Sequence, residues 1–415
     1  MTALRIAWRN LGRNRKRTLL AVGAIALAQT TLVFVNGLMA GSYDQMLQTI
    51  TGPMIGHVQV HHRQWREERA IDLYLDHLDA VRTEIAGLPD VATVSPRLYS
   101  AALAASGEKR AQPADAEPGM IVGVDPSVES GPGGLLESLP PDVHPRGKRV
   151  AVGRVLANRL HVNEGEELAL IGQDVQGFPA SDLFAIVAII DSPVDLVKTR
   201  GVVMSMETAA EFLEMPNQAH EIVICGSNVD RADALAREIA ALPAVSGMEV
   251  LSWREAVPEF SRMIDMKDWF DLIFLAIVFV AAASGIANTS MMSTFERTRE
   301  LGMLLAIGLR PAGVVRMVLV EAVLLGLMGV VIGSFAGSGL VLLTAHTGIN
   351  YAALAGVESA DVAFGGVSIS YIIYPRFGFK DILFGFIAVT LTSALASTWP
   401  ATLAGRLEPA KAMRS

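Results

Sequence analysis

Four stretches of the sequence contain no Asp, Glu, Lys or Arg, and each is at least 24 residues long. They are residues 18–43, 272–295, 322–357 and 382–405. An α-helix needs about 20 mostly apolar residues to cross the hydrocarbon core of a membrane. Because each stretch is long enough for one crossing, we predict four membrane spans, at 18–42, 269–295, 312–345 and 380–403.

The composition agrees with a membrane protein. Hydrophobic residues make up 51% of the chain, and its mean hydropathy is +0.40. Charged residues reach only 18%, against about 25% in an average soluble domain. These values exclude a disordered chain and argue against an ordinary cytosolic enzyme. Basic patches with interleaved aromatic residues are missing from the sequence, so we expect no nucleic-acid partner.

The basic residues near the predicted span ends set the orientation. Positively charged side chains near membrane spans collect on the cytoplasmic side. They gather in three segments: before span 1 (Arg5, Arg9, Arg13, Arg15, Lys16, Arg17), between spans 2 and 3 (Arg297, Arg299, Arg310, Arg316) and after span 4 (Arg406, Lys411, Arg414). We therefore expect a multi-pass membrane protein with both termini in the cytoplasm.

The long region between spans 1 and 2 has the opposite charge balance. Residues 41–267 carry 33 acidic and 19 basic side chains. This region and the loop 346–379 are predicted to lie outside the cytoplasm. One alternative is that span 1 is a cleaved signal peptide, because Ala40-Gly41-Ser42 resembles a cleavage site. The apolar stretch is longer than the usual 7–15 residues of such a peptide, which favours a retained span.

The predicted organisation has nine parts. An amphipathic segment 1–17 comes first, with Leu4, Trp8 and Leu11 on one helix face and arginines on another. It is either a helix lying on the inner membrane surface or only a basic flank. The other parts are span 1 (18–42), a mixed α+β domain (43–268), span 2 (269–295), a cytoplasmic segment (296–311), span 3 (312–345), a loop outside the cytoplasm (346–379), span 4 (380–403) and a cytoplasmic C-terminus (404–415).

Within 43–268, hydrophobic patterns predict alternating strands and helices. Strands are expected at 57–61, 120–124, 167–171, 183–190 and 221–225, a strand followed by a helix at 149–160, and helices at 79–87, 208–213 and 232–242. Residues 126–147 are rich in Pro and Gly and predict a loop. The domain is large enough for two subdomains, with 111–200 inserted into one made of 53–110 and 201–267.

Motifs of the common catalytic and metal sites are missing from the sequence. Gly147-Lys148 is followed by Arg149, so it is not a phosphate-binding loop, and His220-Glu221 lacks the second histidine of a zinc protease. His57 and His61 would lie about 13 Å apart on one face of a strand, too far to share a metal ion. We therefore expect no catalytic residues, no metal and no cofactor bound by this chain.

Polar and small residues inside the spans have two interpretations each. Glu321 in span 3 either has a functional role or, being near the cytoplasmic end, simply reaches the headgroups or pairs with Arg316. Gln29 and Asn36 share a face of span 1 and face either another helix or a cavity. Gly329, Gly333 and Gly337 recur every four residues, which is typical of close helix packing, either internal or with a second subunit.

Residues 296–311, here called the coupling segment, carry the most specific motif. Arg297, Glu300, Leu301, Gly302, Ala306, Ile307 and Gly308 match the pattern R-x-x-E-[ILV]-G-x-x-[RK]-A-[ILV]-G. This resembles the segment by which FtsX/MacB-like ABC transporter permeases contact their ATPases. Leu305 departs from the pattern, since a basic residue is usual there.

Other parts of the chain resemble the same family. They are 7–11 and 17–20 at the entrance to span 1, Glu321-Ala322 in span 3, and Trp399-Pro400-Ala401 with residues 407–414 at the C-terminal end. Residues 56–61 and 123–126 resemble the outer domain of the lipoprotein-releasing LolC/LolE branch.

The resemblance implies a permease subunit without its own ATPase. Such permeases work in pairs, with the same chain or a sibling, beside a cytoplasmic ATPase dimer that uses ATP and Mg. In the LolC/LolE branch they extract lipoproteins from the membrane and pass them to a periplasmic carrier. The resemblance also implies a place in the bacterial inner membrane and two sets of site residues. For ATPase coupling they are Arg297, Arg299, Glu300, Leu301, Gly302, Leu305, Ala306, Ile307 and Gly308. A candidate substrate cavity is formed by Gln29, Val33, Asn36, Phe274 and Ile277.

Two other functions stay open. MacB-like relatives export small molecules or peptides from the periplasm, and the cell-division branch regulates a periplasmic hydrolase instead of transporting. An intramembrane enzyme would need paired catalytic residues, for which the sequence shows no candidates.

Overall fold

The computed structural model describes residues 15–107, 116–351, 353, 356, 362–364, 367–369 and 372–408. The chain forms two compact units. Unit 1 comprises Met1–Asp44, Ile264–Glu358 and Tyr371–Ser415, and unit 2 comprises Gln45–Met263 and Ser359–Ser370. The amphipathic segment predicted at 1–17 lies almost wholly outside the described residues, as does the end of the chain after 408.

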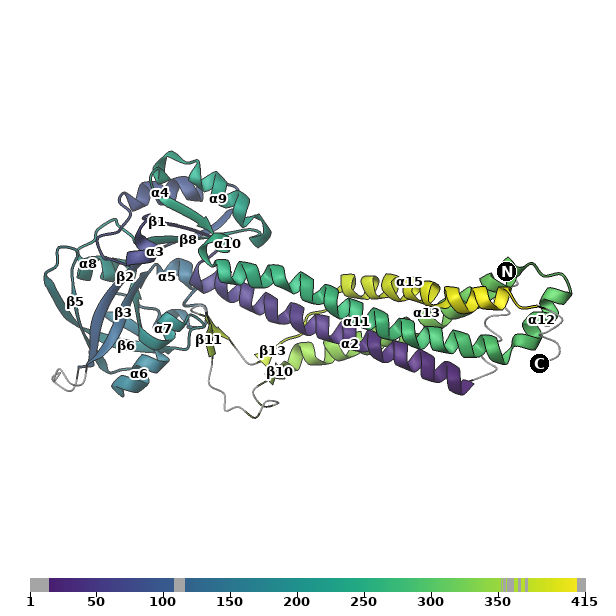
Figure 1. The fold of residues 1–415 in the computed structure, drawn as a ribbon. Helices are drawn as coiled ribbons and strands as arrows, with labels where there is room; N and C mark the ends of the chain where they lie inside the picture. Colours follow the sequence, from purple (N-terminus) through teal and green to yellow (C-terminus); the bar gives the residue numbers. More distant parts are fainter. Residues whose placement is uncertain are drawn as a thin grey trace. The chain divides into compact units, whose positions relative to one another are not determined.

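Unit 1 is built from long apolar helices that run alongside one another (Figure 1). The helices are α2 (Arg15–Thr49), α11 (Pro258–Glu296), α12 (Thr298–Ala306), α13 (Pro311–Thr347) and α15 (Phe379–Gly405). The short strands β10 (Ile349–Asn350) and β13 (Ile372–Ile373) pair after α13. Among the described residues, four helices are long and apolar enough to cross a membrane, namely α2, α11, α13 and α15. The predicted fold class, four membrane helices with a large α+β domain after the first, is confirmed.

Helix α13 packs closely against α2 through its three spaced glycines. A Cβ atom at Gly329 would lie 2.6 Å from Cβ of Ile25, and one at Gly337 would lie 2.9 Å from Cβ of Val33. At Gly333 a Cβ atom would overlap the carbonyl oxygen of Ala26. Only glycine lets the two backbones approach this closely. The small-residue repeat therefore serves a contact inside the chain.

Helix α11 has far fewer contacts inside unit 1. Only 12% of its most apolar window is buried, against 44% for α13. Its large side chains Trp269, Phe274 and Ile277 are exposed. A helix that is apolar all round is stable when lipid or another protein covers it.

Unit 2 contains one nine-stranded mixed sheet within its described residues, in the order β3-β7-β4-β6-β5-β2-β8-β1-β9. The strands are β1 (Val58–His61), β2 (Val91–Ser106), β3 (Glu117–Val124), β4 (Arg149–Gly153), β5 (Glu167–Gln173), β6 (Pro179–Ile190), β7 (Gly201–Ser205), β8 (Glu221–Gly226) and β9 (Glu249–Ser252). The helices are α3 (Trp65–Glu68), α4 (Leu78–Ala86), α5 (Pro126–Glu129), α6 (Arg154–Leu160), α7 (Asp195–Arg200), α8 (Met206–Leu213), α9 (Ala232–Ala240) and α10 (Trp253–Ala256), with 3-10 turns at Pro141–Val143, Val229–Arg231 and Pro243–Val245. Unit 2 also holds the hairpin of β11 (Val362–Phe364) and β12 (Val367–Ile369).

Strand β2 pairs with three neighbours in this sheet, β3, β5 and β8. Its 16 residues pair with β8 through the first half and with β3 and β5 through the second half. One core lies around β1, β8, α4 and α9, and two others lie between residues 98 and 215. The largest of these cores combines residues of all three predicted segments, 53–110, 111–200 and 201–267. Strand β7, which we placed with 201–267, instead pairs with β3 and β4 of the inserted part.

We predict that Gly333→Ala destabilises unit 1 by about 1–3 kcal/mol, because the added methyl group overpacks the α2 contact. Gly339→Ala is the matched control, since a Cβ atom at Gly339 would have nothing within 4 Å. The measurement is the thermal unfolding midpoint of the purified chain in detergent. Equal midpoints for the two variants would contradict the packing assignment.

Candidate functional site

One face of the coupling segment is attached to the rest of unit 1. Helix α12 follows α11 directly, and its Leu301 is only 1% exposed. Leu301 belongs to a cluster with Val314, Met317, Val318, Ala401 and Ala404 of α13 and α15. Gly302 is also buried. The inner face of α12 therefore packs on α13 and α15.

The opposite face of the coupling segment is apolar, and its side chains are exposed in the described part of the chain. Ile307 is 78% exposed, and Met303, Leu304 and Leu309 are exposed as well. Gly308 ends the helix with φ of +100°, a conformation that side chains other than glycine rarely adopt. An amphipathic element of this kind fits a groove on a partner protein.

Arg297 faces the interior of unit 1. Its Nε donates to Oε2 of Glu300 at 3.1 Å, and its Nη1 donates to Oε2 of Glu321 at 3.0 Å. Ser293 donates to the other Glu321 oxygen at 3.4 Å. The Arg297 and Glu321 side chains are 13% and 10% exposed. Glu321 thus pairs with the coupling segment, and not with Arg316 as one of our two sequence-based interpretations had it.

The predicted coupling residues therefore separate into two groups. Leu301 and Gly302 are buried against α13 and α15, Leu305 packs partly buried against the same cluster, and Arg297 is held by carboxylates. Arg299, Ala306, Ile307 and Gly308 are exposed. Glu300 is partly exposed beside Arg297. The motif thus combines an internal anchor with an outward surface.

The five predicted cavity residues are not brought together in the described structure. Gln29 is fully buried, where its Nε2 donates to Oγ of Ser334 at 3.3 Å, and Val33 packs on Gly337. Phe274 and Ile277 are instead exposed on α11, and Asn36 is half-buried. Gln29 and Val33 therefore take part in helix packing, which was one of the two interpretations of the Gln29 side chain.

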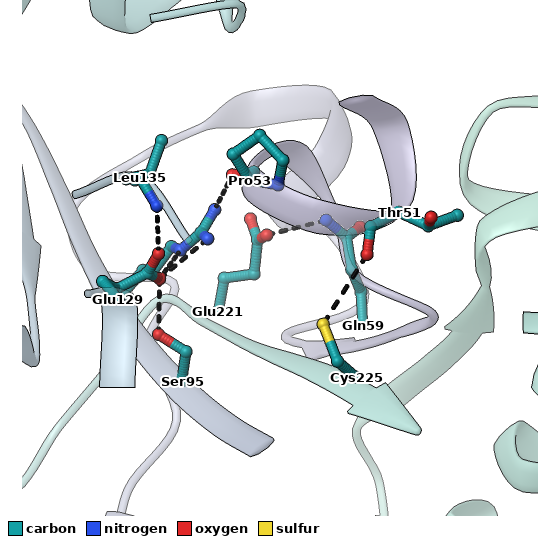
Figure 2. Close-up of polar contacts among 9 residues, drawn as sticks. Thr51, Pro53, Gln59, Ser95, Glu129, Leu135, Glu221 and Cys225 are labelled. Atoms are coloured by element: carbon teal, nitrogen blue, oxygen red, sulfur yellow. Dashed lines mark hydrogen bonds and ion pairs between the residues drawn. The ribbon is translucent and has the colours of Figure 1, made fainter. Parts of the chain in front are cut away.

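Sequence reasoning missed a buried charged cluster in unit 2 (Figure 2). Arg97 of β2 and Glu129 of α5 are each 2% exposed. The Arg97 Nε and Nη2 atoms lie 2.9 and 2.8 Å from Oε1 of Glu129. Ser95 also donates to this oxygen, and the backbone N–H of Leu135 donates to Oε2. The sequence signal that could have indicated this cluster is Arg97, the one charged residue in a run of apolar and small residues from 91 to 106.

The electrostatics of this cluster favour a charged Arg97. Burial alone would lower the pKa of Arg97, but the nearby Glu129, with smaller contributions from Tyr99 and Glu221, raises it above its usual value. Burial also raises the pKa of Tyr99 to about 12, with Glu221 acting in the same direction. Arg97 is therefore a permanent cation inside unit 2.

Among the residues that the structure describes, no group of three or more His, Cys, Asp or Glu is placed so that it could hold a metal ion. His57 accepts a hydrogen bond from the backbone N–H of Gly226, and burial lowers its pKa. Burial raises the pKa of the Cys225 thiol.

Comparison with known proteins gives two family matches. Residues 18–242 match the model of the MacB-like periplasmic core domain, and residues 272–409 match the model of the FtsX-like permease C-terminal domain.

Individual relatives fall into two groups. The lipoprotein-releasing system transmembrane protein LolC of Xylella fastidiosa is 22% identical over 95% of this chain and 92% of its own length. The pyoverdine export ATP-binding/permease protein PvdT of Pseudomonas entomophila is 27% identical over 60% of this chain and 38% of its own. The macrolide export ATP-binding/permease protein MacB of Nitrobacter winogradskyi is 29% identical over 43% and 27%. A crystal structure of the MacB periplasmic region from Actinobacillus actinomycetemcomitans aligns with a TM-score of 0.32 at 11% identity, covering 50% of this chain and 92% of that one.

We predict that Arg297→Gln destabilises unit 1 by about 3 kcal/mol, because Glu321 then keeps a buried charge without its cation. The double variant Arg297→Gln/Glu321→Gln should recover most of this loss. Arg299→Gln, in the same segment but exposed, should change stability by less than about 0.5 kcal/mol. Detergent-induced unfolding measures all three, and a double variant no better than the single one would argue against a paired charge.

Proposed function

We propose that this chain, which belongs to the family of ABC transporter permeases with a MacB-like periplasmic core domain, extracts lipoproteins from the inner membrane. An ATPase partner would supply the energy, binding the ATP and Mg that this chain is not expected to bind. The permease would pass its cargo to a periplasmic carrier. This assignment refines the broader one, a permease of the LolC/MacB type, which the family matches establish.

The extent of the match to LolC carries the choice of lipoprotein over other cargo. That alignment covers 95% of this chain and 92% of the relative. The alignments to the PvdT and MacB export proteins cover at most 60% of this chain and 38% of the relative. The names of those proteins describe one chain that both binds ATP and acts as a permease. A phosphate-binding loop, which ATP binding would require, is missing from this sequence.

Export of a small molecule or peptide is the second candidate function. It is favoured by the identity to PvdT, which reaches 31% over a stretch of 140 residues. The folds of unit 1 and unit 2 are equally compatible with lipoprotein release and with export of a small molecule or peptide. The distinction therefore depends on cargo and not on the fold.

The arrangement in the membrane follows from charge. We place the coupling segment and both termini in the cytoplasm, where the basic residues gather. Unit 2 then lies in the periplasm. The apolar, largely uncovered α11 supports a position beside lipid or beside a second permease, which is either the same chain or a sibling.

The exposed apolar face of the coupling segment is the proposed ATPase contact. It is formed by Met303, Leu304, Ile307 and Leu309, all of them exposed. Apolar side chains grouped on one face are typical of a docking surface. A push on this face would reach α13 and α15 directly, because Leu301 and Arg297 attach α12 to them.

We predict that Ile307→Asp abolishes co-purification of ATPase activity with the tagged chain from native membranes. The substitution places a charge on the docking face without removing an internal contact, since Ile307 is 78% exposed. Phe178→Asp is the control, an exposed apolar residue of unit 2, and should retain the activity. ATPase activity that stays with the Ile307→Asp variant would disprove the docking assignment.

Native mass spectrometry of the purified complex tests the cargo. We expect a bound species with the mass of an acylated lipopeptide or lipoprotein, which survives removal of excess phospholipid. A complex that instead retains a small polar molecule or peptide would favour the export function.

A further inference from the structure

Helix α2 ends inside unit 2 in an irregular way. A π-helical turn, η1 (Ile50–Met54), follows its last regular residue, and this turn contains Pro53. Proline has no N–H group, and a helix end leaves its last carbonyl groups without partners in the helix. The carbonyl groups around Pro53 therefore need donors from elsewhere in unit 2.

Arg97 supplies one of these donors. Its Nη1 donates to the Pro53 carbonyl oxygen at 2.8 Å, while the same guanidinium group pairs with Glu129. The end of a helix carries partial negative charge, so a cation there is favourable. One side chain of β2 thus holds both the end of α2 and the carboxylate of α5.

The surrounding groups keep Arg97 in place. Glu129 accepts from Ser95 and from the backbone of Leu135, which fixes its carboxylate (Figure 2). Glu221 of β8 accepts from Gln59 of β1 at 2.7 Å and adds negative charge near Arg97. A guanidinium group with this many partners loses little further freedom when it binds one more acceptor.

A second set of contacts meets the same turn. Cys225 of β8 donates weakly to the Thr51 carbonyl oxygen at 3.6 Å (Figure 2). A Cβ atom at Gly52 would lie 3.0 Å from the carbonyl oxygen of Gly133, so the turn also presses on the loop after α5. The end of α2 is therefore fitted against β2, β8 and this loop at once.

We propose that Arg97 is a positioning residue that fastens the C-terminal end of α2 to the central strand of unit 2. A displacement of this helix end is then carried into β2, which pairs with β3, β5 and β8. The role of this Arg97–Pro53 contact in transport rests on the proposed function. In such a transporter the contact would carry the movement driven by the ATPase from α2 into unit 2.

The competing explanation is that Arg97 and Glu129 only stabilise the core of unit 2. Removing both charges separates the two roles. In Arg97→Met/Glu129→Gln neither member of this ion pair is left as an unpaired buried charge, and Glu221 keeps Arg69 at 3.9 Å. The amide oxygen introduced at position 129 can still accept from Ser95 or Leu135. The donor to Pro53 is lost.

Hydrogen exchange of the full chain in lipid nanodiscs, read by mass spectrometry, tests the proposal. We expect exchange of peptides covering 45–57 to rise about tenfold or more, because a charge-assisted hydrogen bond is lost locally. Peptides of β4, β6 and β7 should exchange as in the unchanged chain. The control Arg82→Met/Asp125→Asn removes a more exposed ion pair of the same unit and should leave 45–57 unaffected.

Two results would contradict the proposed role of Arg97. One is unchanged exchange at 45–57 in the Arg97→Met/Glu129→Gln variant, and the other is an equal rise throughout unit 2. If that variant does not fold, Arg97→Lys replaces it in the experiment. The lysine ammonium group cannot reproduce the guanidinium geometry that reaches both Glu129 and the Pro53 carbonyl. A smaller rise in hydrogen exchange, confined to residues 45–57, is then expected. The measurement needs no ATPase, so its failure is distinct from a failure of the docking assignment.

Discussion

A charge that is removed from water needs a partner of opposite charge. In this chain two largely buried arginines, Arg97 and Arg297, are paired with carboxylates, and each also contacts the end of a helix or the turn after it. Burying an ion without compensation costs several kcal/mol, so a buried cation stays where its carboxylates are. Arg297 lies between α11 and α12 and pairs with Glu300 and Glu321. Arg97 pairs with Glu129 and binds the carbonyl group of Pro53 after α2. In both places a paired arginine also holds the end of a long helix, at Arg297 through its ion pair with Glu321 of α13 and at Arg97 through its hydrogen bond to the turn after α2.

The contacts between the membrane helices follow a different rule. Lipid is as apolar as a leucine side chain, so helices associate through close packing and not through the hydrophobic effect. Gly329, Gly333 and Gly337 provide that close packing between α13 and α2. Helix α11 is far less buried within the chain. One part of unit 1 is thus firmly packed, while α11 offers an apolar surface to its surroundings.

Much of this arrangement could be predicted, because the cost of charge in lipid leaves a clear pattern in the sequence. The four charge-free stretches located the membrane helices, and the glycine spacing identified a packing face. Helix α11 begins at Pro258, earlier than expected, since its first turns contain charged residues such as Glu259. Strand β2 was missed because Pro96, Arg97 and several alanines hide its pattern, and only pairing with three neighbours stabilises it. The motif identified the coupling segment in the sequence. Which of its residues face inward could not be predicted, because that depends on contacts with later helices, such as the Arg297–Glu321 ion pair and the packing of Leu301 on α13 and α15.

The central proposal is that ATP binding by an ATPase docked on the coupling segment changes the position of unit 2 with respect to unit 1. Spin labels at Phe178→Cys and Leu395→Cys, both exposed positions, in a Cys225→Ser chain allow the distance between the units to be measured by pulsed electron resonance. In the complex with its ATPase, our account predicts one distance distribution without nucleotide and a clearly shifted one with ATP bound. The same distribution in both states, with ATP occupancy of the partner verified, would contradict it.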